Sequence, residues 1–239
     1  MFVSSPAIVL NRVKHTDSTF ITTLYTKQMG SVSFCMKIPK TAKSQLKHTL
    51  IQPLNLLSIE WDHKPNSTLQ HIRNFHSSHP YSTIYRQSQK VIIASFLTET
   101  INHALRQEHQ GEVYEFIEKS LLWFDEQEKD YDNFHLVFLI SLAKRLGFEP
   151  LTENCRIYKY FDLINGEYCN TTPTHNYYLQ HNDAKHIPLF INMDYTNMTH
   201  VALNQQQRMR ALRIITTYLR LHITNFPKLH SLEIFGNSL

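Results

Sequence analysis

The hydrophobic period of this chain changes once, and this change constrains the fold more than any other feature of the sequence. Before about residue 76 apolar and polar residues alternate, most clearly from Ser31 to Ile38. A period of two is typical of a β-strand with one buried face. After residues 76–80 (HSSHP) the apolar residues recur every three or four positions, which is the helical period. We therefore predict an α+β protein with a strand-rich domain at 1–78 and a mainly helical domain at 79–239.

Five segments of the first part have the length and composition of short strands. Gly30 lies in a turn between two of them, where it can adopt a positive φ. Pro39 ends the third strand and begins the longest connection. Such a set fits a small closed Greek-key barrel of the OB type, although an SH3-like barrel fits the strand count almost as well. The predicted strands are 7–14, 19–26, 31–38, 54–61 and 68–75.

The sequence pattern of the second part predicts helices with one irregular insertion. Apolar stripes at helical spacing lie in 97–105, 113–124 and 134–146, and a last helix is expected at 203–222. Gly147 follows the third stripe as a predicted helix-ending residue. The insertion spans 150–187 and contains a β-like stretch, an Asn-Gly turn and a second β-like stretch.

The charges are distributed unevenly between the two parts. Residues 1–80 contain nine Lys or Arg but only three Asp or Glu, whereas the remainder has a small excess of acids. This asymmetry is typical of an anion-binding module on a scaffold, although ordinary solubilising charge would give the same totals. Charged residues are 18% and aromatic residues 12% of the chain, which excludes a disordered protein.

A basic loop after the third strand is the main candidate for binding a polyanion. Its lysines are three or four residues apart and no acid lies among them, so their mutual repulsion would be relieved by phosphates. Phe34, Tyr25 and Phe75 are candidate stacking platforms for bases, although the alternation around Phe34 favours a core position. The predicted DNA-binding residues of the barrel are Arg12, Lys14, Lys37, Lys40, Lys43, Lys47 and Arg73.

The last helix offers a second basic surface. It carries Arg208, Arg210, Arg213 and Arg220, and the spacing puts Arg213 and Arg220 on one face. Arg210 and Arg213 are predicted to bind phosphates. The same pattern also fits the ordinary polar face of an amphipathic helix.

Several short motifs, in this order, resemble the RecO family of bacterial recombination mediators. The resemblance spans nearly the whole chain. It rests on Gly30, the strand 31–36, Lys37, the loop 40–47 with Lys43-Ser44, Gln52-Pro53, the helix end LAKRLGFEP (142–150) and the tail PKLHSLEIF (227–235). The chain departs from the family pattern at Ile38, where many members have glycine.

The resemblance implies a function without catalysis. It implies binding of single- and double-stranded DNA, annealing of complementary strands, and loading of RecA onto strands coated by single-strand-binding protein, together with RecR. It also implies a site for the C-terminal tail of single-strand-binding protein on the helical domain, for which Lys144, Arg145 and Leu146 are the candidate residues. The expected location is the bacterial cytoplasm, at the nucleoid. Many members have four zinc-binding cysteines, but here only Cys155 and Cys169 fall in that region, so no zinc is expected.

Other functions have less support in the sequence. No GxGxxG, GxxxxGK[ST], GxSxG or HExxH motif occurs, so nucleotide-fold, hydrolase and zinc-protease signatures are missing. Three cysteines fit a reducing compartment, and no secretory leader or membrane span is expected. Two alternatives stay open, namely an interaction scaffold whose OB-like barrel does not bind DNA, and a metal-dependent nuclease using some of the 15 histidines.

Overall fold

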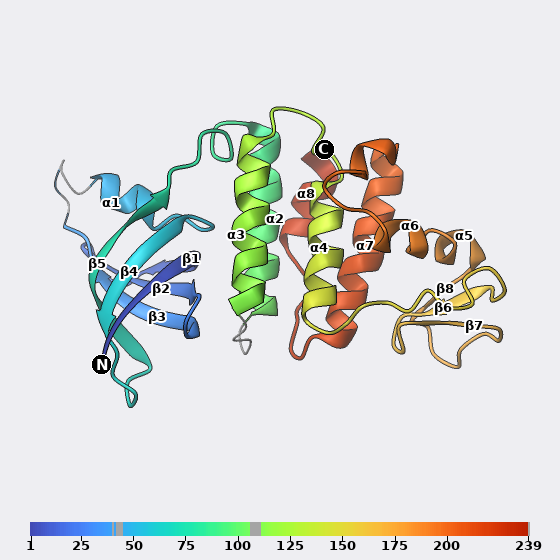
Figure 1. Cartoon of the computed structure of the whole chain (residues 1–239), viewed down its shortest axis with the longest axis horizontal. Helices are drawn as coiled ribbons and strands as arrows, with labels where there is room; N and C mark the ends of the chain where they lie inside the picture. The colour runs from blue at the N-terminus through green and yellow to red at the C-terminus, as the bar shows by residue number, and fades with distance from the viewer. Residues whose placement is uncertain (40, 42–44, 106–110, 239) are drawn as a thin grey trace. The chain divides into compact units, whose positions relative to one another are not determined.

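The computed structural model describes residues 1–39, 41, 45–105 and 111–238 (Figure 1). They form two compact units, one made of Met1–Glu126 with Leu229–Ser238 and the other of Gln127–Lys228. No helix among the described residues is both long and apolar enough to span a bilayer.

The first unit begins with a closed five-stranded barrel, coloured blue to green in Figure 1. Its strands follow the order β1-β2-β3-β5-β4, and β4 pairs back onto β1. All neighbours are antiparallel except β3 and β5. This order is that of an OB-type barrel, so the first fold prediction is confirmed and the SH3-like alternative is wrong. The strands are β1 Phe2–Lys14, β2 Thr19–Thr26, β3 Gly30–Lys37, β4 Leu56–Asp62 and β5 Leu69–His79, with helix α1 Gln45–Leu50 between β3 and β4.

The barrel closes because the alternating residues of its strands fill one core. Phe34, Met36 and Ile38 are fully buried, as their alternation predicts. Phe34 packs edge-on against Trp61 with ring centroids 5.4 Å apart. Gly30 has φ 65°, which permits the tight turn from β2 into β3.

Helices α2 (Ser88–Ala104), α3 (Gly111–Glu126) and α8 (Ser231–Ser238) complete the first unit. A buried polar cluster joins the segment after β5 to the end of α3. The Asp125 carboxylate accepts hydrogen bonds from the amides of Ser82, Thr83 and Ile84. The buried Lys90 ammonium donates to the backbone carbonyl of Phe124.

The start of α8 is tied to α2 by another carboxylate. Glu99 accepts hydrogen bonds from the amides of His230 and Ser231, which belong to the otherwise unsatisfied first turn of α8. The α8 helix was not predicted. The predicted domain boundary at 78–79 falls at the last residues of β5, and this division of the chain stays a prediction.

The second unit combines two longer helices with the expected insertion. The insertion holds a small sheet of order β7-β6-β8, and Gly166 turns with φ 70° between two of its strands. A capping box, in which Asn204 and Gln207 bond each other's backbone amides, starts α7 close to the predicted position. The elements are α4 Phe134–Arg145, β6 Tyr160–Asp162, β7 Glu167–Cys169, β8 Tyr178–Leu179, α5 His181–Ala184, α6 Ile187–Ile191, a 3-10 turn Met198–His200 and α7 Gln205–His222.

Candidate nucleic-acid interface

The pairing register of the barrel decides which side of the sheet each predicted cation occupies. Arg12 pairs with Thr22, and Thr22 pairs with Phe34, whose side chain lies in the core. Side chains of directly paired residues lie on the same face of a sheet. Arg12 therefore continues the inner row of side chains beyond the end of the core, where it is exposed. Lys14 does the same in the next inner row, which contains Met36.

Helix α1 lies close to this inner side of β1. The Arg12 guanidinium donates a hydrogen bond of 3.0 Å to the carbonyl of His48. The His48 ring packs edge-on against Phe20 of β2 with centroids 5.3 Å apart. On the same helix the Lys47 ammonium lies 5.7 Å from the ring centre of Phe75. Helix α1 thus brings Arg12 and Lys47 together at one end of the barrel.

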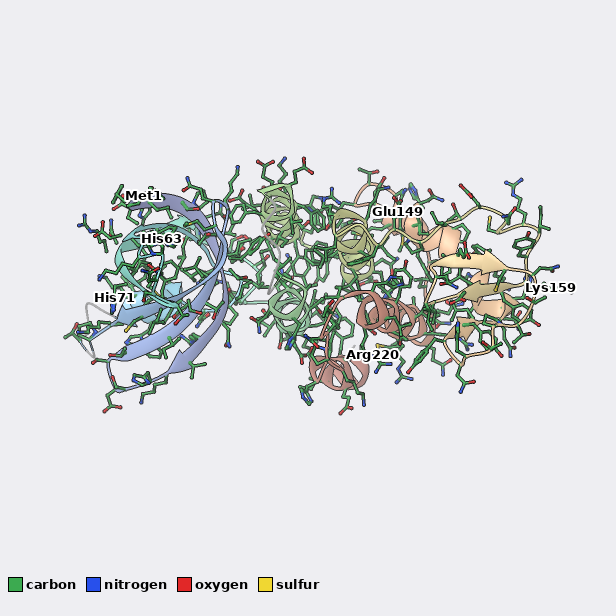
Figure 2. All side chains as sticks on the ribbon, turned by 90° about the horizontal axis from the view of Figure 1, so that it is seen from below. Met1, His63, His71, Glu149, Lys159 and Arg220 are labelled. Carbon is green, nitrogen blue, oxygen red and sulfur yellow. The ribbon has the colours of Figure 1, made fainter. Side chains whose placement is uncertain are left out.

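Lys37 and Arg73 lie on the other, outer face of the sheet. Lys37 is two residues after Cys35, and Arg73 is two residues after His71. Cys35 and His71 are paired in parallel register, and His71 is exposed on the outside of the barrel (Figure 2). The structure therefore does not bring all the predicted barrel cations to one groove but divides the described ones between two faces. Lys40 and Lys43 lie outside the described residues.

Two of the predicted barrel cations already have a carboxylate partner. Lys14 pairs with Asp17 at 2.9 Å, and Arg73 pairs with Asp62 at 2.5 Å. All four side chains are largely exposed. Exposed ion pairs contribute little to stability, so a phosphate can compete with these carboxylates. Within the described part of the chain, Lys37 and Lys47 have no ion pair.

Two of the three expected stacking residues are unavailable. Tyr25 is buried and stacks on Tyr114 of α3, with centroids 6.2 Å apart. Phe34 is buried in the core, which was the favoured interpretation of its alternation. Phe75 is half-buried beneath Lys47. The expectation that Tyr25 stacks on bases is therefore wrong, whereas Phe75 stays a candidate.

The arginines of α7 have different environments in the second unit. Arg208 is mostly buried and donates to the Asn133 side chain and the Leu203 carbonyl, so its role is structural. Arg210 is exposed and pairs with Asp183 at 2.5 Å, which raises the pKa of the guanidinium. Arg213 and Arg220 are exposed, and neither forms an ion pair among the residues that the structure covers.

The insertion of the second unit does not have the donors of a zinc site. Cys155 and Cys169 are both free thiols, whereas structural zinc needs four ligands. Burial raises the pKa of the Cys169 thiol, which opposes the thiolate that a metal requires. Among the residues that the structure describes, no three His, Cys, Asp or Glu side chains form a metal-binding group. The expected absence of zinc stays a prediction.

A groove in the first unit was missed by the sequence analysis. Its volume is about 550 Å³. Its lining comes from β1, from the segment that follows α1, from Tyr85, from α2 and from α8. Arg12 and Tyr85 both contribute to the lining. No sequence signal identifies this groove, because most of the segments that line it are far apart along the chain.

Comparison with known proteins gives consistent results along the whole chain. Residues 1–81 match the family model described as "Recombination protein O N terminal", and residues 86–233 match "Recombination protein O C terminal". A curated protein of Phocaeicola vulgatus, named "DNA repair protein RecO", is 35% identical over 235 residues, with 98% of each chain covered. A protein of the same name from Bacteroides fragilis is 34% identical over 236 residues, again with 98% of each chain covered.

Proposed function

Since the chain belongs to the RecO family of DNA repair proteins, we propose that it acts as a recombination mediator that binds DNA without catalysing a reaction. It binds single- and double-stranded DNA, anneals complementary strands, and helps to load RecA onto strands coated by single-strand-binding protein. Its site of action is the bacterial cytoplasm, at the nucleoid.

The observation that carries this proposal is the set of exposed cations on the OB-type barrel. Lys37 and Lys47 have no ion pair in the described structure, and Arg12 is held at the same barrel end as Lys47 by its bond to the His48 carbonyl. Barrels of this type bind single strands by combining cations for the phosphates with rings for the bases. Phe75 beneath Lys47 provides such a combination.

Annealing requires no bond to be made or broken in the protein. Two strands repel each other because both are polyanions, and cations between them lower that repulsion. Cations on two faces of one barrel suit this role, because each face can hold a separate strand. The contribution of the protein is then electrostatic, and it falls as salt concentration rises.

The protein partners follow from the family and not from a located site. We propose RecR as a partner in loading RecA, and the C-terminal tail of single-strand-binding protein as a ligand of the helical part. The protein assists RecA indirectly, by making the coated single strand accessible to it.

Salt-dependent titration of a short fluorescent single strand tests the proposal. We expect Lys37→Glu/Lys47→Glu to weaken binding at least about tenfold at ~50 mM salt, for all sequences alike, and to make the salt dependence shallower. The control Lys159→Glu/Lys185→Glu makes the same charge change at exposed positions of the second unit. Equal losses in both variants, or wild-type binding that ignores salt, would contradict DNA binding at the barrel.

A further inference from the structure

The groove of about 550 Å³ in the first unit has a size typical of small-molecule sites. It runs along one face of α2, because its lining includes Val91, Ser95, Thr98 and Asn102 at helical spacing. The eleven helical steps from Val91 to Asn102 extend ~16 Å, which is long enough for more than one base. Ile234 of α8 also contributes to the lining.

The groove combines apolar surface with an aromatic ring held in place. Tyr85 is 37% exposed. Its hydroxyl donates a hydrogen bond of 2.6 Å to the carbonyl of Pro53, and its ring packs edge-on against Tyr81. Val91 and Ile234 are the exposed aliphatic residues of the lining. Such a surface offers stacking and apolar contact to a flat ring.

One cationic side chain in the lining of the groove can contact a phosphate. Arg12 lies in the lining and uses one nitrogen for the His48 carbonyl, so its other donors can reach a phosphate. Glu99 is the acidic residue of the lining, and its carboxylate is occupied by the amides at the start of α8. Asn11, Gln52 and Asn102 add amide groups that both donate and accept, as base edges require.

We propose that this groove takes unstacked bases of a single strand whose phosphates are held by Arg12 and the nearby Lys47. The inference rests on the proposed DNA-binding function and deepens it, because it gives the barrel cations a neighbouring site for bases. A duplex keeps its bases stacked inside, so it can use the cations but not the groove. Changes in the groove should therefore alter the affinity for single strands but not the affinity for duplexes.

A pair of substitutions at one position tests the groove. Ser95 is exposed on the groove face of α2, so Ser95→Trp fills the groove while Ser95→Ala leaves it open. Both variants are titrated with a fluorescent single strand and with the duplex of the same sequence. We expect Ser95→Trp to weaken single-strand binding about 5- to 150-fold, since base stacking contributes ~1–3 kcal/mol, and to leave duplex binding within about twofold. Ser95→Ala is the matched control and should lose less single-strand affinity than Ser95→Trp.

A second variant and a spectroscopic signal distinguish the loss of the groove from misfolding of the protein. Tyr85→Ala removes the platform without filling the groove, and should show the same selective loss. A strand carrying 2-aminopurine should change its fluorescence on binding the wild type but not on binding Ser95→Trp. Circular dichroism of each variant checks the fold.

The outcomes distinguish this inference from the proposed function. If the wild type binds DNA in a salt-dependent manner but Ser95→Trp and Tyr85→Ala keep their single-strand affinity, the groove serves something else, such as a protein segment, and the inference is wrong. Equal losses of single-strand and duplex affinity in Ser95→Trp also overturn it. If the wild type does not bind DNA at all, the proposed function itself fails.

Discussion

The two compact units carry similar basic side chains, but the contacts of the individual side chains differ. In the barrel, Arg12 and Lys47 contact a carbonyl and a ring, so their charge stays available. In the second unit, Arg208 is built into the fold and Arg210 is paired with Asp183. The number of basic residues in a segment is therefore a poor guide to phosphate binding, and the contacts of each side chain are a better one.

The largest expected effect concerns the buried carboxylates that hold each unit together. Asp125→Ala in the first unit removes the acceptor of three backbone amides next to buried Lys90. We expect it to lower the free energy of unfolding by about 3–5 kcal/mol, because each buried amide left without its acceptor costs about 1–3 kcal/mol. Asp162→Ala in the second unit, which leaves two backbone amides without their acceptor, should cost about 1–2 kcal/mol. Urea denaturation followed by circular dichroism measures both, and a larger loss for Asp162→Ala would contradict this order.

The second prediction compares the acid sensitivity of the two units. Burial and nearby Arg208 lower the pKa of His135 in the second unit to about 3, so the folded protein keeps this ring neutral. Because the pKa of His135 is lower in the folded than in the unfolded protein, the free energy of unfolding is highest above the ordinary pKa of 6.5. It decreases as the pH falls from 6.5 towards 3, since only the unfolded protein binds the proton there. Hydrogen bonds from Ser82, Thr83 and Ile84 lower the pKa of Asp125 in the first unit to about 2, so its contribution is lost only below about pH 4.

We therefore expect the second unit to lose stability first on acidification, by up to about 1.4 kcal/mol per pH unit below 6.5. Hydrogen exchange at pH 7 and pH 4.5, resolved by segment, measures this for α4 and α3 separately. His135→Leu should remove most of the dependence between these pH values. Equal loss of protection in both helices of the wild type would show that the histidine is not the cause.

The third prediction compares the two basic surfaces directly. Lys37→Glu/Lys47→Glu is expected to reduce single-strand affinity at least about tenfold, whereas Arg213→Glu/Arg220→Glu should reduce it about threefold or less. Both double variants change the net charge equally, so the difference reports location. Fluorescence anisotropy at one salt concentration suffices for the comparison. An equal effect of the two variants would mean that α7 is part of the same binding surface.

The smallest effect is expected from removing the carboxylate partners. Asp17→Asn removes the ion pair of Lys14, and we expect single-strand affinity to rise about twofold because the partner held Lys14 only weakly. Asp183→Asn does the same for Arg210 in the second unit and should change affinity less. Titration at low salt makes both effects easiest to detect. If only Asp183→Asn increases single-strand affinity, the DNA interface lies at α7 and not at the barrel.

Much of the barrel could be predicted because its strands alternate cleanly. The predicted strand 19–26 coincides with β2, and the predicted 31–38 differs from β3 by one residue at each end. Strand order was the uncertain part, since an OB-type and an SH3-like barrel share the strand count. The parallel pairing of β3 with β5 decided it, and this pairing joins residues that are far apart in the sequence.

The face of Arg12 could not be predicted, and one irregularity in β1 is the reason. The pairing register shifts between Val9 and Asn11, which is a β-bulge. The extra residue reverses the alternation, so Arg12 lies on the inner row while Val13 is 55% exposed. A strict period of two from Val9 predicts the opposite. The short helices α5 and α6 were missed for a different reason, since four or five residues are too few to show a period.

The bend at Leu54 has a consequence for how fast a ligand can be accommodated. This residue adopts φ 68°, a conformation that is costly for leucine, and its carbonyl accepts a hydrogen bond from the Tyr81 hydroxyl while the neighbouring Pro53 carbonyl accepts one from Tyr85. Two tyrosines therefore fix this wall of the groove before any strand arrives. If a single DNA strand binds here, no loop has to become ordered at this wall. Its association rate should then be limited by diffusional encounter and not by a slow closing motion of the protein.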